Sequence, residues 1–350
     1  METALTYALA YISSVLSTKD IKPTIITILA DNDYYSQPSK TTSLTPNTTG
    51  KFTDFGVRLQ DANKTGLGSS AALVTAFTGA ILSHYLPVST FSLTSDEGRA
   101  KLHNLAQAAH CAAQGKVGSG FDIAAAVYGT CVYRRFSPSI LSVLGEPPSS
   151  GFATRVRNIV DDTDSAVKWD TQISKGGVTI PKGMALVMCD VDCGSETVGM
   201  VKKVLEWRKQ DPQGSKALWD ELQGCNEALA ETLTAGPVDA LEGAFSEIRA
   251  RIRAMGEKSG VPIEPPEQTE LLDAVTRHVG GVFGGVVPGA GGYDAIVLLV
   301  RHDRETMEEL EAFLAKWSAE KQSNVKLLSA KGELEGARKE NAVTYGEFAK

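Results

Sequence analysis

The chain has 350 residues, 42% hydrophobic and 22% charged, so it is long enough to form two domains that each bury a core. Its formal net charge of -7 argues against a general nucleic-acid binder, because such a protein needs a basic surplus to neutralise phosphates. No apolar run is long enough to span a membrane. The five cysteines form no paired C-x-x-C set, so we expect them to be reduced thiols and the protein to be cytoplasmic.

The first fifty residues contain three different patterns. Apolar residues at helical spacing predict a helix over residues 1–16. Residues 22–30, which are rich in isoleucine after Pro23, predict a strand. The Asn/Ser/Thr/Pro-rich stretch 31–53 predicts a long loop, and a loop of this length in a compact domain is usually either mobile or functional.

A glycine-rich stretch follows, with the sequence Lys64-Thr65-Gly66-Leu67-Gly68-Ser69-Ser70-Ala71-Ala72, and it leads into an apolar run to residue 82 that has no helix breaker except one glycine. The pattern predicts a tight loop that feeds the N-terminus of a helix. Such a terminus offers unpaired N–H groups and the positive end of the helix dipole, which suit a phosphate. On this stretch alone, a serine-capped helix after a turn is an equal alternative.

A second glycine-rich stretch follows the helix predicted over residues 96–114. It reads Gly115-Lys116-Val117-Gly118-Ser119-Gly120-Phe121-Asp122 and continues as Ile-Ala-Ala-Ala. A carboxylate at this place is expected to be half-buried and therefore hydrogen-bonded or paired, with Lys116 as the expected partner of Asp122. The alternative is that Asp122 caps the following helix.

The rest of the chain predicts a second domain that begins near residue 182. Its strands are expected at 184–191, 282–287, 295–300 and 324–328, and its helices at 195–207, within 215–259, at 265–278 and at 304–320; a further strand at 129–136 precedes the boundary. The turn Pro288-Gly289-Ala290-Gly291-Gly292-Tyr293-Asp294 either reverses the chain or makes room for a ligand.

Together the three glycine-bearing loops resemble those of the GHMP kinase superfamily. Gly66 to Ala72 is similar to its ATP-phosphate loop, Gly118 to Asp122 to its catalytic-aspartate segment, and Pro288 to Asp294 to its third motif. Ala112 to Lys116 and Gly194 to Val198 resemble the phosphomevalonate branch. The resemblance implies an α+β fold of two domains: residues 1–182, similar to ribosomal protein S5 domain 2, and residues 183–350, ferredoxin-like.

The implied reaction transfers the ATP γ-phosphoryl group to (R)-5-phosphomevalonate in isoprenoid (ergosterol) synthesis, so the implied partners are small molecules, with no nucleic acid and no membrane. Asp122 is the implied catalytic residue, and Ser69 and Ser70 are the implied Mg²⁺ ligands. Asp294 is expected to be structural. The implied ATP-binding residues are Lys64, Gly66, Leu67, Gly68, Ser69, Ser70 and Ala71. The implied substrate-binding residues are Lys116, Ser119, Ser195, Thr197, Gly289, Ala290, Gly291 and Gly292.

The chain departs from the superfamily pattern at its beginning. Members begin with a strand and a Ser-x-x-Gly-Lys-type segment that carries a lysine near the phosphates, and this sequence does not show them. Loss of these strands is expected to leave an unpaired sheet edge, with reduced stability and weak or absent activity. Two alternatives stay open: a noncatalytic GHMP-fold protein that binds a ligand and regulates a partner, and another small-molecule kinase of this fold, such as a mevalonate or homoserine kinase.

Overall fold

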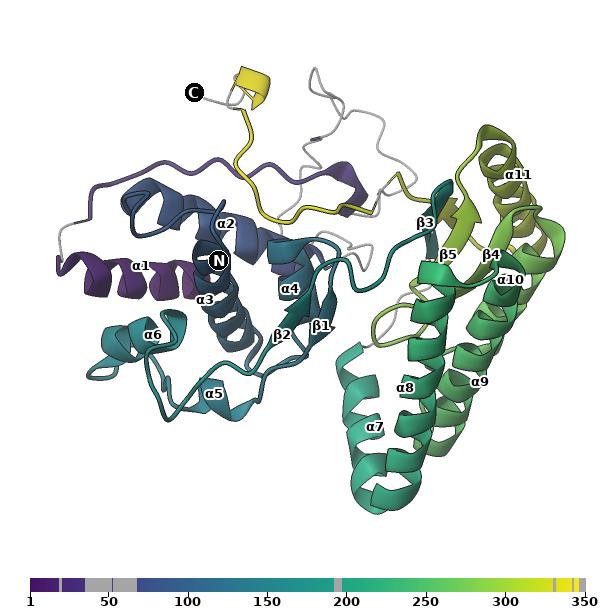
Figure 1. Cartoon of the computed structure of the whole chain (residues 1–350), viewed down its shortest axis with the longest axis horizontal. Helices are drawn as coiled ribbons and strands as arrows, with labels where there is room; N and C mark the ends of the chain where they lie inside the picture. The colour runs from purple at the N-terminus through teal and green to yellow at the C-terminus, as the bar shows by residue number, and fades with distance from the viewer. Residues whose placement is uncertain are drawn as a thin grey trace. The chain divides into compact units, whose positions relative to one another are not determined.

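A computed structural model describes residues 1–18, 21–34, 52, 68–191, 197–329, 332–341 and 343–345. The chain divides into two compact units, one formed by residues 1–177 with 333–350 and the other by residues 178–332 (Figure 1). Helices and strands occur in both units, as the predicted α+β class requires. The predicted division into family domains after residue 182 stays a prediction.

The described residues of the first unit are mainly helical. Its elements are α1 (Glu2–Leu16), η1 (Asn32–Tyr34), α2 (Ser69–Tyr85), α3 (Asp96–Gln114), α4 (Phe121–Tyr128), β1 (Val132–Arg134), α5 (Ser139–Ser142), α6 (Phe152–Val160) and β2 (Gln172–Ser174). Strands β1 and β2 pair antiparallel, with Tyr133 opposite Ile173. The segment 332–341 also belongs to this unit, because the Glu333 carbonyl accepts from the Thr130 N–H and the Ala337 N–H donates to the Val127 carbonyl.

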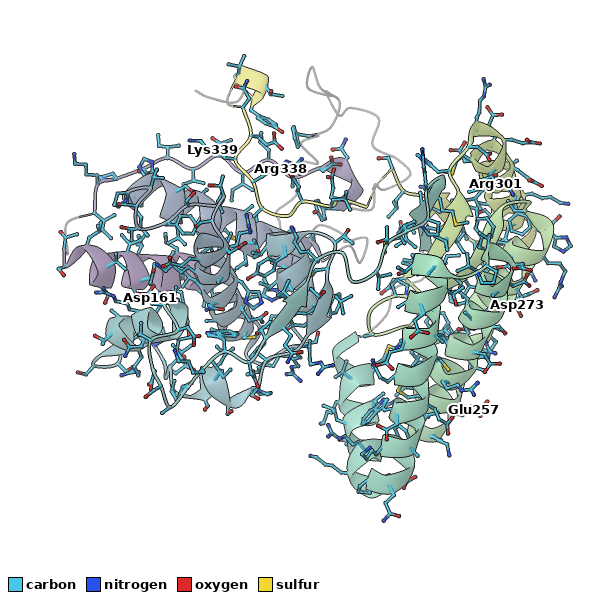
Figure 2. The ribbon with its side chains drawn as sticks, in the orientation of Figure 1. Asp161, Glu257, Asp273, Arg301, Arg338 and Lys339 are labelled. Atoms are coloured by element: carbon cyan, nitrogen blue, oxygen red, sulfur yellow. The ribbon has the colours of Figure 1, made fainter. Side chains whose placement is uncertain are left out.

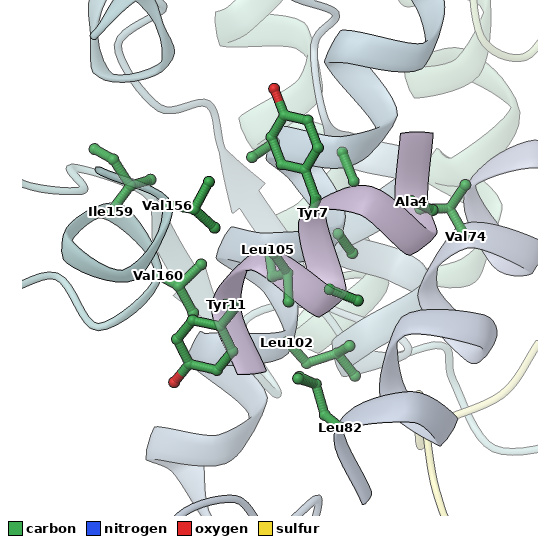
Figure 3. Packing of buried hydrophobic residues seen from close by; sticks show 14 of the residues in the cluster. Ala4, Tyr7, Tyr11, Val74, Leu82, Leu102, Leu105, Val156, Ile159 and Val160 are labelled. Atoms are coloured by element: carbon green, nitrogen blue, oxygen red, sulfur yellow. The ribbon is translucent and has the colours of Figure 1, made fainter. Parts of the chain in front are cut away.

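The core of the first unit forms where α1 packs against α2, α3 and α6 (Figure 3). Tyr7 and Tyr11 of α1 are buried, and the Tyr7 and Phe152 rings pack edge to face with their centres 5.1 Å apart. The Tyr11 hydroxyl donates to Asp161, labelled in Figure 2, at 2.6 Å, so its buried polar atom is satisfied. Because each large apolar side chain contributes about 1.5–3 kcal/mol when buried, this face explains why residues 1–16 form the predicted helix.

The predicted strand over residues 22–30 is wrong. This segment has no regular secondary structure, and Ile25, Ile26 and Ile28 are 89%, 40% and 47% exposed. A strand is stabilised by the N–H and C=O groups of a neighbour, and no described strand pairs with these residues. Instead, the Tyr85 hydroxyl at the end of α2 donates to the Lys22 carbonyl at 2.6 Å.

His103 of α3 is a buried titratable group in this core, with the rings of Tyr128 and Trp169 against it. Burial lowers its pKa from 6.5 to about 4, against the opposing effect of its hydrogen bond to Asn104. The histidine is therefore neutral in the folded protein and takes up a proton on unfolding below pH 6.5.

We expect the stability that His103 contributes to be fully present above pH 6.5 and to be lost as the pH falls toward 4, by about 3 kcal/mol in the free energy of unfolding. Urea unfolding at several pH values between 7.5 and 4, for the wild type and His103→Phe, measures this. Other titrating groups cancel in the difference. Equal slopes for the two proteins over this range contradict the prediction.

The second unit is built on a four-stranded antiparallel sheet with the order β4-β5-β3-β6. Its elements are β3 (Met184–Val191), α7 (Thr197–Gln210), α8 (Pro212–Ala235), η2 (Val238–Ala240), α9 (Leu241–Ser259), α10 (Pro266–His278), β4 (Val282–Val286), β5 (Ala295–Arg301), α11 (Arg304–Lys321) and β6 (Val325–Leu327). In the register of the central pair, Cys189 lies opposite Ile296. The predicted strands and helices of this half are confirmed within a few residues.

Helices cover both faces of this sheet, which explains why β5 reads as a continuous apolar run. Leu298 belongs to the cluster that α10 and α11 form with the sheet. The next residue, Leu299, points to the opposite face, where it packs with Leu241 and Phe245 of α9. Burial on both faces makes this sheet a rigid base for the glycine-rich turn between β4 and β5.

The cysteines and the helix lengths bear on two predictions made from the sequence. Cys111, Cys131, Cys189 and Cys225 are free thiols, as expected, and Cys193 lies outside the described residues. Among the described helices, none combines the length and apolar character that crossing a bilayer requires.

Candidate active site

Helix α2 begins directly after Gly68, which has a left-handed φ of 70°. Ser69, Ser70 and Ala71 form the first turn of the helix, and no side chain caps it. The alternative of a serine-capped helix is therefore wrong, because both serines lie inside the helix. Because no side chain caps the helix, its first N–H groups and its partial positive charge remain available to a ligand. The predicted residues Lys64, Gly66 and Leu67 lie outside the described residues.

The two serines have different surroundings. Ser69 is only 9% exposed, whereas Ser70 is half-buried, with its hydroxyl 3.1 Å from Nε2 of His110. His110, on α3, is 4% exposed, and the side-chain amide of Gln114 lies 3.0 Å from the same Nε2. The Ser70 hydroxyl is thus oriented by His110, which in turn contacts Gln114 one helical turn further along α3.

Asp122 lies in the first turn of α4, whose N-cap residue is Gly120 at a φ of 85°. The carboxylate is half-buried and accepts from the N–H of Ile123 at 2.9 Å. The expected ion pair with Lys116 is wrong, since no ion pair joins these two described residues and Lys116 is exposed. The helix dipole at the start of α4 stabilises the carboxylate instead. The alternative role as N-cap residue is also wrong, because Asp122 is the second residue of the helix.

The beginnings of α2 and α4 lie side by side in the first unit. A Cβ added to Gly68 would lie 3.7 Å from the Cβ of Asp122. The predicted phosphate loop and the predicted catalytic carboxylate are thus neighbours, although 53 residues lie between Gly68 and Asp122 in the sequence. Two helix N-termini, a serine hydroxyl and a carboxylate at one place can hold an anion and accept or orient a proton beside it.

Tyr133 of β1 holds the loop that precedes Asp122. Its hydroxyl donates to the Ser119 carbonyl at 2.8 Å. A Cβ on Gly120 would lie 2.4 Å from Oε1 of Gln107 and 2.7 Å from the Tyr133 hydroxyl, so only glycine fits there. Burial raises the pKa of Tyr133 to about 12, and the negative charge of Asp122 acts in the same direction. The tyrosine therefore remains a hydrogen-bond donor at neutral pH.

The third glycine-rich turn belongs to the second unit and joins β4 to β5. Gly289, Gly291 and Gly292 have φ values of 67°, 82° and 107°. The Gly292 N–H donates to the Ile263 carbonyl at 2.9 Å, and the Gln268 side chain donates to the Tyr293 carbonyl at 2.8 Å. The turn is therefore held by the segment between α9 and α10 and by the first turn of α10.

The remaining predicted residues lie in three places. Lys116 and Ser119 are exposed on the loop between α3 and α4. Thr197 is the first residue of α7, and Ser195 lies outside the described residues. The Asp294 carbonyl accepts from the Val191 N–H at 2.8 Å, which gives this residue a backbone role in the sheet.

Sequence reasoning did not identify His110, Gln107 or Tyr133 as neighbours of the site. One signal was available, namely that polar side chains recur at helical spacing at positions 107, 110 and 114 of the helix predicted over 96–114. Their partners come from α2 and from the loop before α4, which spacing along one helix does not reveal.

Gly291 and Gly289 form a matched pair for a test of the third turn. Both are left-handed, but a Cβ on Gly291 would lie 2.3 Å from the Ile263 carbonyl oxygen, whereas Gly289 has nothing within 4 Å. Gly289→Ala is expected to lower the free energy of unfolding by about 1 kcal/mol, from backbone strain alone. Gly291→Ala adds a clash with the backbone and is expected to lower it by a further 1–3 kcal/mol, roughly. Urea unfolding measures both, and equal losses contradict the prediction.

The oxygen atoms at this site fit a magnesium ion that also binds phosphate. Among the described residues no group of three or more His, Cys, Asp and Glu side chains could hold a metal by itself. Mg²⁺ in phosphate-binding sites takes only one or two protein oxygens, together with substrate phosphates and waters. The Ser70 hydroxyl and the Asp122 carboxylate are oxygen donors of this kind.

Comparison with known proteins gives matches along the whole chain. Residues 54–130 match the family GHMP kinases N terminal domain, and residues 238–320 match the family GHMP kinases C terminal. The chain is 56% identical to phosphomevalonate kinase ERG8 of Gibberella zeae, over 99% of this chain and 77% of that protein. It is 48% identical to phosphomevalonate kinase erg8 of Aspergillus fumigatus, over 99% of this chain and 74% of that protein.

A solved structure shares the fold at lower sequence identity. The crystal structure of Streptococcus pneumoniae phosphomevalonate kinase aligns with a TM-score of 0.51 and 20% identity, over 75% of this chain and 69% of that chain. At this identity, the likeness concerns the fold alone.

Proposed function

This chain belongs to the GHMP kinase family, and to the phosphomevalonate kinases within it, and from this premise we propose that it transfers the γ-phosphoryl group of ATP to (R)-5-phosphomevalonate. The products are 5-diphosphomevalonate and ADP. The observation that carries the proposal is the position of Asp122 beside the N-terminus of α2, because the reaction needs a phosphate-binding end and an orienting carboxylate at one place.

In the proposed reaction an oxygen of the acceptor's 5-phosphate attacks the γ-phosphorus. One P–O bond forms as the bond to the β-phosphate oxygen breaks, and ADP leaves with the electron pair. A phosphate monoester has its second pKa near 6, so the acceptor is mostly a dianion at neutral pH. Asp122 therefore orients the attacking phosphate and takes its remaining proton where one is present. Positioning contributes more than proton abstraction.

The start of α2 is the proposed binding site for the ATP phosphates. The N–H groups of Gly68 to Ala71 and the positive end of the helix favour the β- and γ-phosphates. Mg²⁺, when bound, offsets the negative charge that develops during transfer. Ser70 is the better placed of the two predicted metal ligands, because Ser69 is 9% exposed whereas Ser70 is half-buried and its hydroxyl is oriented by His110. Lys64, Gly66 and Leu67 complete the proposed loop.

The remaining predicted residues are proposed to contact the acceptor. Lys116 and Ser119 supply a cation and a hydroxyl from the loop before α4, and Ser195, Thr197 and the turn Gly289 to Gly292 supply further contacts. A cytoplasmic location is part of the proposal, supported by four free thiols that are compatible with a reducing compartment.

An assay that couples ADP release to NADH oxidation tests the proposal, with phosphomevalonate, mevalonate and homoserine as acceptors in the presence of Mg²⁺. Whatever turnover the chain shows is expected to favour phosphomevalonate, with at least about 100-fold lower kcat/KM for the other two acceptors, because the site orients a phosphate rather than a hydroxyl. Preference for mevalonate or homoserine assigns the chain to another kinase of this fold. Ligand binding without turnover of any acceptor supports the noncatalytic alternative.

A further inference from the structure

Arg135 is a cation at the candidate site that has no acidic partner. It directly follows β1 and is exposed, and one guanidinium nitrogen, Nη2, donates to the Val117 carbonyl at 3.0 Å. Among the described residues, no carboxylate forms an ion pair with it. Its guanidinium also lies 5.9 Å from the centre of the Phe136 ring, which restrains the side chain further.

The contact with Val117 places Arg135 on the loop that leads to Asp122. Tyr133, two residues earlier in the chain, donates to the Ser119 carbonyl, so the two side chains hold successive parts of one loop. The positive charge of Arg135 lowers the pKa of the Tyr133 hydroxyl and the negative charge of Asp122 raises it, so both charged groups lie near this hydroxyl. The guanidinium is thus in the neighbourhood of the catalytic carboxylate.

The proposed reaction requires a cation at this position. A 5-phosphate dianion must lie beside the Asp122 carboxylate, and two like charges at short distance repel each other unless a cation offsets them. Arginine has five N–H donors in a planar fork, which matches phosphate oxygens bidentately. One hydrogen bond to Val117 fixes the guanidinium and leaves the other donors for an anion.

We propose that Arg135 binds the 5-phosphate of the acceptor and holds it against Asp122. This assignment rests on the proposed function and adds a substrate-specificity residue to it. Lys116 directly precedes Val117, and its compact ammonium group sits on a flexible stem. The planar guanidinium of Arg135, held by Val117, is better suited to orient a phosphate.

The test compares Arg135→Gln and Arg135→Lys with the matched control Arg134→Gln. Arg134 is the neighbouring exposed arginine, at the alternate position of β1. Isothermal titration calorimetry measures the Kd for (R)-5-phosphomevalonate and for mevalonate, which lacks the 5-phosphate, and steady-state kinetics measures KM for both substrates.

Arg135→Gln is expected to weaken phosphomevalonate binding by about 10- to 100-fold, the range for loss of a charge-assisted hydrogen bond. The Kd for mevalonate and the KM for ATP are expected to stay within about 3-fold, a change below 1 kcal/mol. Arg135→Lys keeps the charge without the fork and is expected to recover part of the affinity. Arg134→Gln is expected to behave as the wild type.

Three results overturn the inference. If Arg135→Gln binds phosphomevalonate as tightly as Arg134→Gln while the wild type turns it over, the inference fails and the proposed function stands. If the loss is equal for phosphomevalonate, mevalonate and ATP, Arg135 only supports the Val117 loop, and the assignment to the 5-phosphate is wrong. A wild-type chain that neither binds nor phosphorylates phosphomevalonate overturns the proposed function and the inference with it.

Discussion

Asp122→Asn is expected to lower kcat for phosphomevalonate by about 100-fold, at the lower end of the range for loss of a general base. The acceptor phosphate needs little help to lose its proton, so most of the loss reflects the missing charge and orientation. Asparagine keeps the size of the side chain and an oxygen that can accept from the Ile123 N–H. The fold is therefore expected to survive, and steady-state kinetics together with the thermal midpoint measures the effect.

Asp96→Asn is the control for the loss of a carboxylate at a helix start. Asp96 lies in the first turn of α3, as Asp122 does in α4, and its side chain is 99% exposed. Each substitution removes a favourable interaction with the helix dipole that is worth about 0.3–1 kcal/mol. We therefore expect similar small losses of stability and a loss of rate in Asp122→Asn alone. An Asp122→Asn enzyme with the wild-type kcat contradicts the catalytic assignment.

Regular helices were predictable from the sequence where local signals agree with burial. Residues 96–114 are an example, since Ser95 caps the helix by accepting from the Gly98 N–H, and Gly115 ends it in a left-handed conformation. The strand predicted over 22–30 failed for a physical reason. Apolar β-branched residues favour a strand only when another strand supplies hydrogen bonds, and the isoleucines of this segment are exposed instead.

The candidate site was predictable in part. The glycine–hydroxyl pattern located the start of α2, and the glycines before Asp122 located the start of α4, because both signals are local in sequence. The contacts of His110 with Ser70 and of Arg135 with Val117 join different elements. Spacing along a single segment carries no information about such pairs. The Lys116–Asp122 pair was wrong for the same reason, since closeness in sequence does not bring two side chains together.

Glu264→Leu is the substitution with the largest expected effect on stability, because it breaks a buried ionic network in the second unit. The Glu264 side chain is fully buried, and its Oε1 accepts from Arg249 at 2.8 Å, from Arg253 at 2.8 Å and from Thr269 at 3.0 Å. Arg249 is also buried and bonds Asp273, labelled in Figure 2, at 2.6 Å. Removing the glutamate leaves a buried guanidinium without its main partner, which costs about 3–5 kcal/mol.

The matched control is Glu247→Gln, which breaks a pair of the exposed Glu247 with the half-buried Arg251 one helical turn away on α9. Surface pairs of this kind contribute about 0.2–1 kcal/mol, so little change is expected. The double variant Arg249→Met/Glu264→Leu is expected to recover part of the loss, because it removes the buried guanidinium that Glu264→Leu leaves with Asp273 as its remaining acidic partner. Urea unfolding measures the three free energies, and a Glu264→Leu loss no larger than that of Glu247→Gln contradicts the prediction.

The same network links stability to the third glycine-rich turn. Glu264 follows Ile263, whose carbonyl accepts the Gly292 N–H, so displacement of this segment removes the support of the turn. Hydrogen exchange at the Gly292 amide is therefore expected to become faster in Glu264→Leu than in Glu247→Gln, beyond the change that global destabilisation produces in α11. Equal acceleration at both places means that the network stabilises the second unit as a whole and has no particular role in positioning the turn.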